Sequence, residues 1–457
     1  MSKRNAFTDT PDQKQPDYLA VSGELLSFIK KCPTPFHTAA VLKEELEKAG
    51  FIYLPETEAW SVMPGSRCFT IRGGTSLIAF QVPEDQPRHF QITAAHSDSP
   101  TFRLKHHPYL PAAGHYVQLN VEKYGGAILS PWLDRPLSIA GRVVVRSASS
   151  GEEVYCLKTR LVNLDRDLVL IPNLAIHMNR RVNEGYEYHV QKDLLPLLGD
   201  ETSEGKLEEM IARELDIEKE QILSSDLFLY NRTPGSLWGA GMEYVSSPKL
   251  DDLQCVFAGL KAFLAGGHTG TVSVFAVFDN EEVGSLTKQG ADSTFLSDSL
   301  ERLWQALKQR PEEYPEAVAG SFLISADNAH ALHPQHQDKS DPVHRPFMNH
   351  GPVIKYHAGQ KYTSDAVSGA AFEMLCEKAG VPWQVFHNHS DQPGGSTLGN
   401  LSNAHVSLNA VDIGLAQLAM HSPYETAGTR DTLYLIRALG TFWQSDLQIE
   451  EGGVRLS

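Results

Sequence analysis

The second half of the chain constrains the fold most, because apolar strand-like runs alternate there with helical patterns. After about Leu237 the helical patterns are Leu250–Leu264, Ser293–Arg310, Ala366–Lys378 and Thr432–Ser445. The strand-like runs are Thr271–Phe278, Gly320–Ser325 and Pro382–Phe386, and Asn403–Ile413 is typical of a strand and a turn. Strands that alternate with helices at this spacing predict an α/β fold with a mainly parallel sheet covered by helices.

The first 100 residues fit the same fold, whereas the next 130 or so do not. Helical patterns at Tyr18–Lys31 and Phe36–Lys48 precede strand patterns at Phe51–Leu54, Arg67–Arg72, Ser76–Val82 and His89–Ala95. From Thr101 to Arg232, β-branched segments are separated by Gly, Ser and Pro, and Lys206–Leu215 is the exceptional helical pattern. We therefore expect a discontinuous catalytic domain, 1–100 and 233–457, with an inserted β-rich domain at 101–232. The polar residues 1–17 are expected to form a flexible arm.

Composition excludes several classes of protein. The 56 acidic residues outnumber the 40 basic ones, giving a formal charge of −16, which argues against a nucleic-acid or membrane partner. No apolar run approaches the roughly 18 residues needed to cross a bilayer. The five cysteines form no C-x-x-C pair, so neither a disulfide framework nor a thiolate zinc site is expected. The N-terminal segment lacks the apolar stretch of a secretory signal, and we expect a cytoplasmic protein.

Acidic and histidine side chains follow three of the predicted strands directly. They are His96 and Asp98 after His89–Ala95, Asp279, Glu281 and Glu282 after Thr271–Phe278, and Asp327 after Gly320–Ser325. In open α/β sheets the ligand crevice lies outside the carboxyl ends of the strands. The sequence therefore predicts that these side chains meet at one edge of the sheet.

Such a cluster of carboxylates would repel itself unless a cation were present. Imidazole and carboxylate without thiolate suit zinc, with manganese or cobalt as alternatives, and the number of acids suffices for two ions joined by a bridging carboxylate. Each segment alone has a simpler interpretation. The segment after His96 is typical of a turn, the run from Asp279 of a solvated loop, the pair Asp251–Asp252 of a helix start, and His421 of a structural histidine.

Six segments, in order and spacing, resemble the M18 family of metalloaminopeptidases, which includes aspartyl aminopeptidase. They are ITAAHSDSP, SSPKLDDL, FDNEEVGS, SADNAHALHP, GPVIKY and AQLAMHS. The similarity runs from about Tyr18 nearly to the C-terminus and includes the β-rich insertion.

The resemblance implies a role for each matching residue in an N-terminal exopeptidase with two metal ions. His96 and Asp327 would bind one ion, Glu282 and His421 the other, and Asp251 would bridge them. The Asp98 carboxylate would accept the second ring N–H of His96 and so fix its tautomer. Glu281 would act as the general base.

The resemblance also implies specificity and assembly. Lys355 and Tyr362 occupy the positions at which aspartyl members hold an acidic substrate side chain, and His330 resembles a residue that lines the substrate site. From the pattern alone, Lys355 could end a strand and Tyr362 could pack. His177 resembles a histidine that reaches a neighbouring subunit's active site, within a tetrahedral homododecamer that admits peptides with a free N-terminus.

Three alternatives remain at this point. The same site could prefer neutral residues such as Leu at the N-terminus of its substrate. A related two-metal hydrolase could act on a C-terminus or an acyl-amino acid, although the motifs contain no clear Arg cluster for an α-carboxylate. The chain could also be an inactive shell-forming or cargo-binding scaffold, although all five expected ligands and Glu281 are present.

Overall fold

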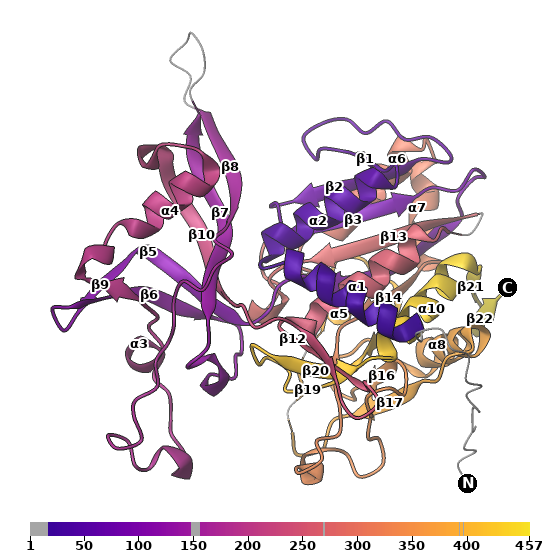
Figure 1. Ribbon diagram of the computed structural model, residues 1–457. Coiled ribbons are helices and arrows are strands. Elements are labelled where there is room, and N and C mark those ends of the chain that lie inside the picture. The colour runs from indigo at the N-terminus through magenta and orange to yellow at the C-terminus, as the bar shows by residue number, and fades with distance from the viewer. Residues whose placement is uncertain (1–16, 148–155, 268–269, 393, 396) are drawn as a thin grey trace.

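The molecule has two parts, each built on its own large sheet. The body drawn on the right of Figure 1 contains a nine-stranded sheet, and the lobe on the left contains a six-stranded sheet. The computed structural model describes residues 17–147, 156–267, 270–392, 394–395 and 397–457. The arm expected at residues 1–17 lies outside this part of the chain except for Asp17, which begins the first helix.

The larger sheet is mixed, with a parallel centre. Its strands lie in the order β1 (Ile52–Tyr53), β2 (Arg67–Arg72), β3 (Ser76–Gln81), β13 (Thr271–Phe278), β4 (His89–His96), β14 (Phe322–Ala326), β18 (Asn409–Gly414), β16 (Val353–Tyr356) and β17 (Gln384–His387). The four strands β13, β4, β14 and β18 are parallel to one another. At the two ends of this run, β3 pairs antiparallel with β13, and β16 pairs antiparallel with β18. Every residue of β3, β4, β13 and β14 is buried, as continuous apolar runs predict.

Helices cover both faces of this sheet. One apolar cluster joins it to α1 (Asp17–Lys31), α2 (Pro35–Lys48), α5 (Leu250–Leu264), α8 (Ala366–Ala379) and α10 (Asp431–Gln444). A second cluster joins the opposite face to α6 (Phe295–Ala306), α7 (Tyr314–Ala319) and α9 (Leu398–Ser402). Phe275 and Val277 of β13 belong to the first cluster and Val274 and Ala276 to the second, since successive strand residues face opposite sides. The helix expected at Ser293–Arg310 ends at Ala306, before Pro311 begins a separate turn.

A second, five-stranded sheet was not predicted from the sequence. Its order is β11 (Ser236–Trp238), β12 (Tyr244–Ser247), β20 (Glu425–Gly428), β19 (Ala416–Leu418) and β15 (Ala329–His330). These strands are two to four residues long, too short for a readable alternation. The sheet borders the candidate site, because β12 leads into α5 and His421 lies between β19 and β20.

The lobe on the left of Figure 1 is built on a six-stranded antiparallel sheet. Its order is β8 (Cys156–Asn163), β7 (Leu137–Ser147), β10 (Ile222–Asn231), β5 (Thr101–Ala112), β6 (Tyr116–Tyr124) and β9 (Leu197–Asp200). It has its own apolar core, against which the apolar side of α4 (Lys206–Leu215) packs. Near α3 (Val190–Asp193) a long exposed loop extends from the lobe. Near the C-terminus, β21 (Leu447–Glu450) and β22 (Gly453–Leu456) form a hairpin.

Among the described residues, no helix combines the length and the apolar character that a bilayer span requires.

Candidate active site

The carboxyl ends of adjacent strands bring the predicted residues together. His96 is the last residue of β4 and lies opposite Phe278, the last residue of β13, in the parallel register. Glu281 and Glu282 follow β13 in a single 3₁₀ turn, and Asp327 follows β14 on the other side of β4. The expectation that three strands deliver these side chains to one edge is therefore confirmed by the register.

Asp251, at the start of α5, lies at the centre of the cluster. Its Oδ1 is 3.3 Å from His96 Nε2, and its Oδ2 is 3.6 Å from His421 Nε2. The two oxygens of one carboxylate thus face two different imidazoles. This is the arrangement that a carboxylate shared by two metal ions requires.

The other two carboxylates divide between the imidazoles. Asp327 Oδ1 lies 3.9 Å from His96 Nε2, whereas Glu282 Oε2 lies 3.3 Å from His421 Nε2. The structure therefore brings together all five residues expected as ligands. Potential ligand atoms of His96, Asp251 and Glu282 all lie within 4.8 Å of one another.

Burial makes this cluster electrostatically costly. Desolvation raises the pKa of Glu282 well above its usual value, and the nearby Asp251 carboxylate adds to the rise. Desolvation likewise raises the pKa of Glu281 to about 8, with further contributions from Asp327 and Asp98. Burial would lower the pKa of His96, but the neighbouring Asp251 and Asp98 carboxylates raise it well above normal. Each group is perturbed by like or opposite charges that a bound cation would compensate.

The buried oxygens fit a divalent metal ion. Within the described residues, Asp251 Oδ1 and Glu282 Oε1 are buried without a hydrogen-bond partner. Such unpartnered buried oxygens are rare in folded proteins, because each carries its full desolvation penalty. Two imidazoles with three carboxylates form a donor set that suits zinc.

Asp98 positions residues of the cluster, but through hydrogen bonds other than the expected one. His96 Nδ1 lies 3.1 Å from the backbone carbonyl oxygen of Asp98 and 3.4 Å from its Oδ1, so the hydrogen bond goes to the carbonyl rather than to the carboxylate. The carboxylate instead accepts the backbone N–H groups of Glu281 and Glu282, each at 3.1 Å, and the Tyr124 hydroxyl at 2.7 Å. Asp98 therefore fixes both the imidazole and the glutamate turn.

Sequence reasoning missed Glu425, a buried residue of β20. Its Oε2 accepts the backbone N–H of Asp251 at 3.0 Å, and its Oε1 accepts that of His421 at 2.7 Å. Desolvation and the nearby Asp251 raise its pKa well above normal. Glu425 thus ties together two of the expected ligands, which come from separate segments. Its neighbours in the sequence, SPYET, contain no motif that would have revealed this.

Asp252 also takes part, although the sequence offered only a helix-start interpretation for it. It is fully buried, and its Oδ2 accepts the backbone N–H of His96 at 3.2 Å. Its side chain also lies close enough to Asp251 and Asp327 to form a second group of potential ligands.

The expected substrate residues lie on one side of the cluster. The buried Lys355, on β16, donates a hydrogen bond from Nζ to the backbone oxygen of Asn328 at 2.9 Å and lies 3.8 Å from Asp327 Oδ2. Burial alone would lower the pKa of Lys355, but Asp327 raises it overall. The buried Tyr362 ring lies 5.7 Å from the same amine, and His330, on β15, is exposed.

His177 is not part of this cluster within one chain. It lies in the exposed loop of the left-hand lobe, and no hydrogen bond or ion pair within the described residues joins it to the site. Its expected role requires a second subunit.

The fold and the buried histidine–carboxylate cluster define the class as a metal-dependent hydrolase, and comparisons with known proteins give the family. The family model described as aminopeptidase I zinc metalloprotease (M18) matches residues 28–443. The chain is 44% identical, over 92% of its length and 98% of the relative's, to the probable M18 family aminopeptidase 2 of Clostridium novyi. The chain belongs to the M18 family of zinc metalloaminopeptidases and is a hydrolase of the exopeptidase type.

Solved structures agree over almost the whole chain. The cryo-EM structure of the Ape4 and Nbr1 complex contains a chain with a TM-score of 0.90 and 34% identity, covering 94% of this chain and 86% of that one. The structure of the Saccharomyces cerevisiae mApe1 dodecamer has a TM-score of 0.82 and 26% identity, covering 93% and 97%.

Proposed function

We propose that this protein removes N-terminal residues, with a preference for Asp and Glu, using two zinc ions. His96 and Asp327 would hold one ion, Glu282 and His421 would hold the other, and Asp251 would be shared by both. The observation that carries the proposal is the position of Asp251, whose two oxygens face His96 and His421 at 3.3 and 3.6 Å. Manganese or cobalt could replace zinc with the same ligands.

Glu281 is the general base in this proposal. Zinc, when bound, supplies positive charge that acidifies water and stabilises a developing oxyanion. Glu281 takes the proton of the attacking water and returns it to the leaving amine. The neighbouring Glu282 side chain is directed to His421, whereas the Glu281 carboxylate has no hydrogen bond or ion pair within the described residues. This division leaves one glutamate of the pair able to move a proton.

Acidic specificity comes from Lys355 and Tyr362. A buried ammonium beside a phenol can recognise a carboxylate side chain in a partly desolvated pocket. One observation favours the alternative, a neutral or Leu preference: the Lys355 amine is already hydrogen-bonded to Asn328 and close to Asp327. His330, exposed beside Phe386 with ring centroids 6.3 Å apart, would contact substrate under either preference.

The experiment is a comparison of kcat/KM on peptides that begin with Asp, Glu or Leu. It is run on the purified enzyme, after chelation, and after zinc, manganese or cobalt is restored. We expect activity to vanish with the metal and return with it, and to be higher on Asp and Glu than on Leu. Higher efficiency on Leu would overturn the acidic preference, and full activity after complete metal removal would overturn the metal assignment.

Residues 101–232 are proposed as the assembly domain of a tetrahedral homododecamer in the cytoplasm. The similar Saccharomyces cerevisiae protein mApe1 is a dodecamer. The loop that carries His177 also exposes Leu174, Ile176 and Met178, which favours burial against another subunit. All five cysteines are free, which suits a reducing compartment.

Complementation tests whether His177 serves a neighbouring site. His177→Ala and Glu281→Gln chains, each inactive in its own homo-oligomer, are co-expressed. Shared sites predict partial recovery of activity in the mixed assembly, because some Glu281 sites then receive a neighbour's intact His177. No recovery in an assembly shown to be mixed would overturn the assignment.

A further inference from the structure

Residues 124–128, called the β6 link below, connect the sheet of the lobe to the surroundings of the metal-binding cluster. Tyr124 is the last residue of β6, and residues after it lie against two of the expected ligands, Glu282 and His421. The β6 link is part of the lobe in the sequence, but in space it adjoins the cluster. Its contacts there are of three kinds.

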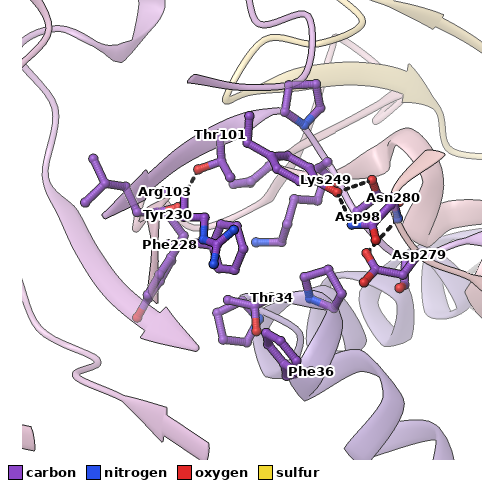
Figure 2. A pocket seen from close by; sticks show the side chains of 18 of the residues that line it. Thr34, Phe36, Asp98, Thr101, Arg103, Phe228, Tyr230, Lys249, Asp279 and Asn280 are labelled. Atoms are coloured by element: carbon purple, nitrogen blue, oxygen red, sulfur yellow. Dashed lines mark hydrogen bonds between the residues drawn. The ribbon is translucent and has the colours of Figure 1, made fainter. Parts of the chain in front are cut away.

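The Tyr124 hydroxyl joins the lobe to the turn that carries both glutamates. Figure 2 shows Asp98 and Asn280 close together on a wall of the cavity between the lobe and the body, and Tyr124 also lines this cavity. The hydroxyl donates a hydrogen bond to Asp98 Oδ2 at 2.7 Å and accepts one from Asn280 Nδ2 at 2.9 Å. Asp98 accepts the backbone N–H groups of Glu281 and Glu282, and Asn280 is the residue directly before them. One hydroxyl from the lobe therefore holds the glutamate turn at two points.

The backbone of the β6 link fixes the His421 ring. The carbonyl oxygen of Gly126 lies 3.0 Å from His421 Nδ1, and the N–H of Ile128 donates to the His421 carbonyl oxygen at 3.0 Å. A carbonyl oxygen can only accept, so Nδ1 carries the proton and Nε2 keeps a free lone pair. Nε2 is the atom that faces Asp251 and Glu282. The lobe thus holds His421 in the tautomer and orientation that metal binding requires.

Between these contacts the β6 link passes close to Glu282. Gly125 has a φ of +74°, and a Cβ atom at this position would lie 3.1 Å from Glu282 Cβ and 3.3 Å from the Glu282 backbone oxygen. Carbon atoms in ordinary contact lie about 3.5–4.0 Å apart. Glycine is therefore required at this position both by the backbone conformation and by the space available.

We infer that the β6 link positions the ligands of the metal centre, so that zinc affinity at the site of His421 and Glu282 depends on the lobe. The inference rests on the metal pair proposed above and gives the lobe a role beyond assembly. Tyr124 and Gly126 are positioning residues, because they orient ligands and do not bind metal themselves. Groups that orient a metal ligand typically change metal affinity by about 10–100-fold.

Zinc competition against a chromogenic chelator tests the inference on the full chain, with the bound ions counted. Gly125→Ala should weaken one of the two zinc ions by about 100-fold and the other by less than about threefold, because the new methyl group displaces Glu282. Gly114→Ala is the matched control. Gly114 lies two residues before β6 with a φ of +72°, and no described residue lies within 4 Å of an added Cβ. This variant carries similar backbone strain and should bind both ions normally.

Tyr124→Phe adds no atom and gives a second test if Gly125→Ala does not fold. We expect it to weaken one zinc ion by about 10–100-fold, because Asp98 and Asn280 lose the hydroxyl that they share. Its control is Tyr116→Phe, at the exposed end of the same strand, which should bind zinc normally.

The unmodified protein separates the failure of this inference from the failure of the proposed function. Fewer than two zinc ions in the unmodified protein would overturn the metal pair and this inference with it. Two ions there, with Gly125→Ala and Tyr124→Phe binding both as tightly as their controls, would overturn this inference alone. It is also overturned if Gly114→Ala weakens zinc binding as much as Gly125→Ala, because the effect would then come from backbone strain in the lobe.

Discussion

The two large sheets differ in where their charged side chains lie. Next to the carboxyl ends of the nine-stranded sheet, the Asp251 and Glu282 side chains are buried with unpartnered oxygens and neighbouring like charges. In the described part of the six-stranded lobe, the ion pairs are exposed or only partly buried, as with Arg181 beside Glu184 or Arg142 beside Asp226. Apolar side chains form the core of that lobe, and its buried polar side chains within the described residues, Ser138 and Asn231, are uncharged.

This difference indicates that the buried charges serve function, whereas the apolar clusters provide stability. Buried, mutually repelling carboxylates destabilise a fold unless something binds them, so their presence indicates a site rather than a structural device. Apolar clusters on both faces of the larger sheet provide the stability against which that cost is set. Within its described residues the lobe carries no such cost, and its long loop and strand β8 are exposed.

The largest effect on activity is expected from the substitution Glu281→Gln. The amide cannot accept a proton, so kcat should fall by about 10²–10⁴-fold while zinc content stays unchanged. Activity assays with metal analysis of the same sample check both statements. Glu47→Gln, an exposed glutamate on α2, is the matched control and should be fully active. Normal turnover by Glu281→Gln would remove the general base from the account.

In the lobe, the corresponding substitution is Leu229→Ala on β10. Leu229 is 1% exposed within the lobe's apolar core, and the cavity left behind should lower the free energy of unfolding by about 2–5 kcal/mol. Urea denaturation measures the loss, and Leu157→Ala at an exposed position of β8 is the control. We expect kcat per folded active site to stay within about twofold. A loss of kcat without a loss of stability would contradict the division of roles.

Glu425→Gln tests the positioning of the cluster, because Glu425 holds the backbone of two expected ligands and is not itself expected to bind metal. One backbone N–H, of Asp251 or His421, would face an amide NH₂ instead of a carboxylate oxygen. Changes of this kind typically reduce metal affinity by about 10–100-fold. Zinc competition against a chromogenic chelator measures the effect, with Glu243→Gln as the control. Unchanged zinc affinity would show that Glu425 does not position the cluster.

The smallest effect is expected at a surface ion pair of the lobe. Asp165→Asn removes one partner of Arg232, which keeps its contact with Asp167. Exposed pairs contribute at most about 1 kcal/mol, so the urea midpoint should hardly move. A loss of several kcal/mol would mean that charge in the lobe is as consequential as charge at the strand ends.

The sequence predicted the parts of this molecule that depend on local pattern. The strand Thr271–Phe278 and the helix Lys206–Leu215 have the expected bounds, because length and periodicity specify them. The helix Leu250–Leu264 also has the expected bounds, but its backbone is kinked at Asp251 and Asp252, which periodicity did not predict. The convergence of His96 and Asp327 followed from their positions directly after parallel strands.

The sequence could not predict what depends on distant backbone groups. Glu425 acts on the N–H of a residue 174 positions away, and no motif near it records that contact. The short strands β15 and β19, which help form the sheet that positions His421, are stabilised by tertiary pairing rather than by propensity. His421 itself was identified only through family resemblance, because no predicted strand or helix ends directly before it.

The most direct test of the account is anomalous X-ray scattering at the zinc edge from crystals of the zinc-loaded protein. We expect two zinc peaks per chain, one between His96, Asp327 and Asp251 and the other between His421, Glu282 and Asp251. A single peak, or peaks that do not share Asp251, would contradict it.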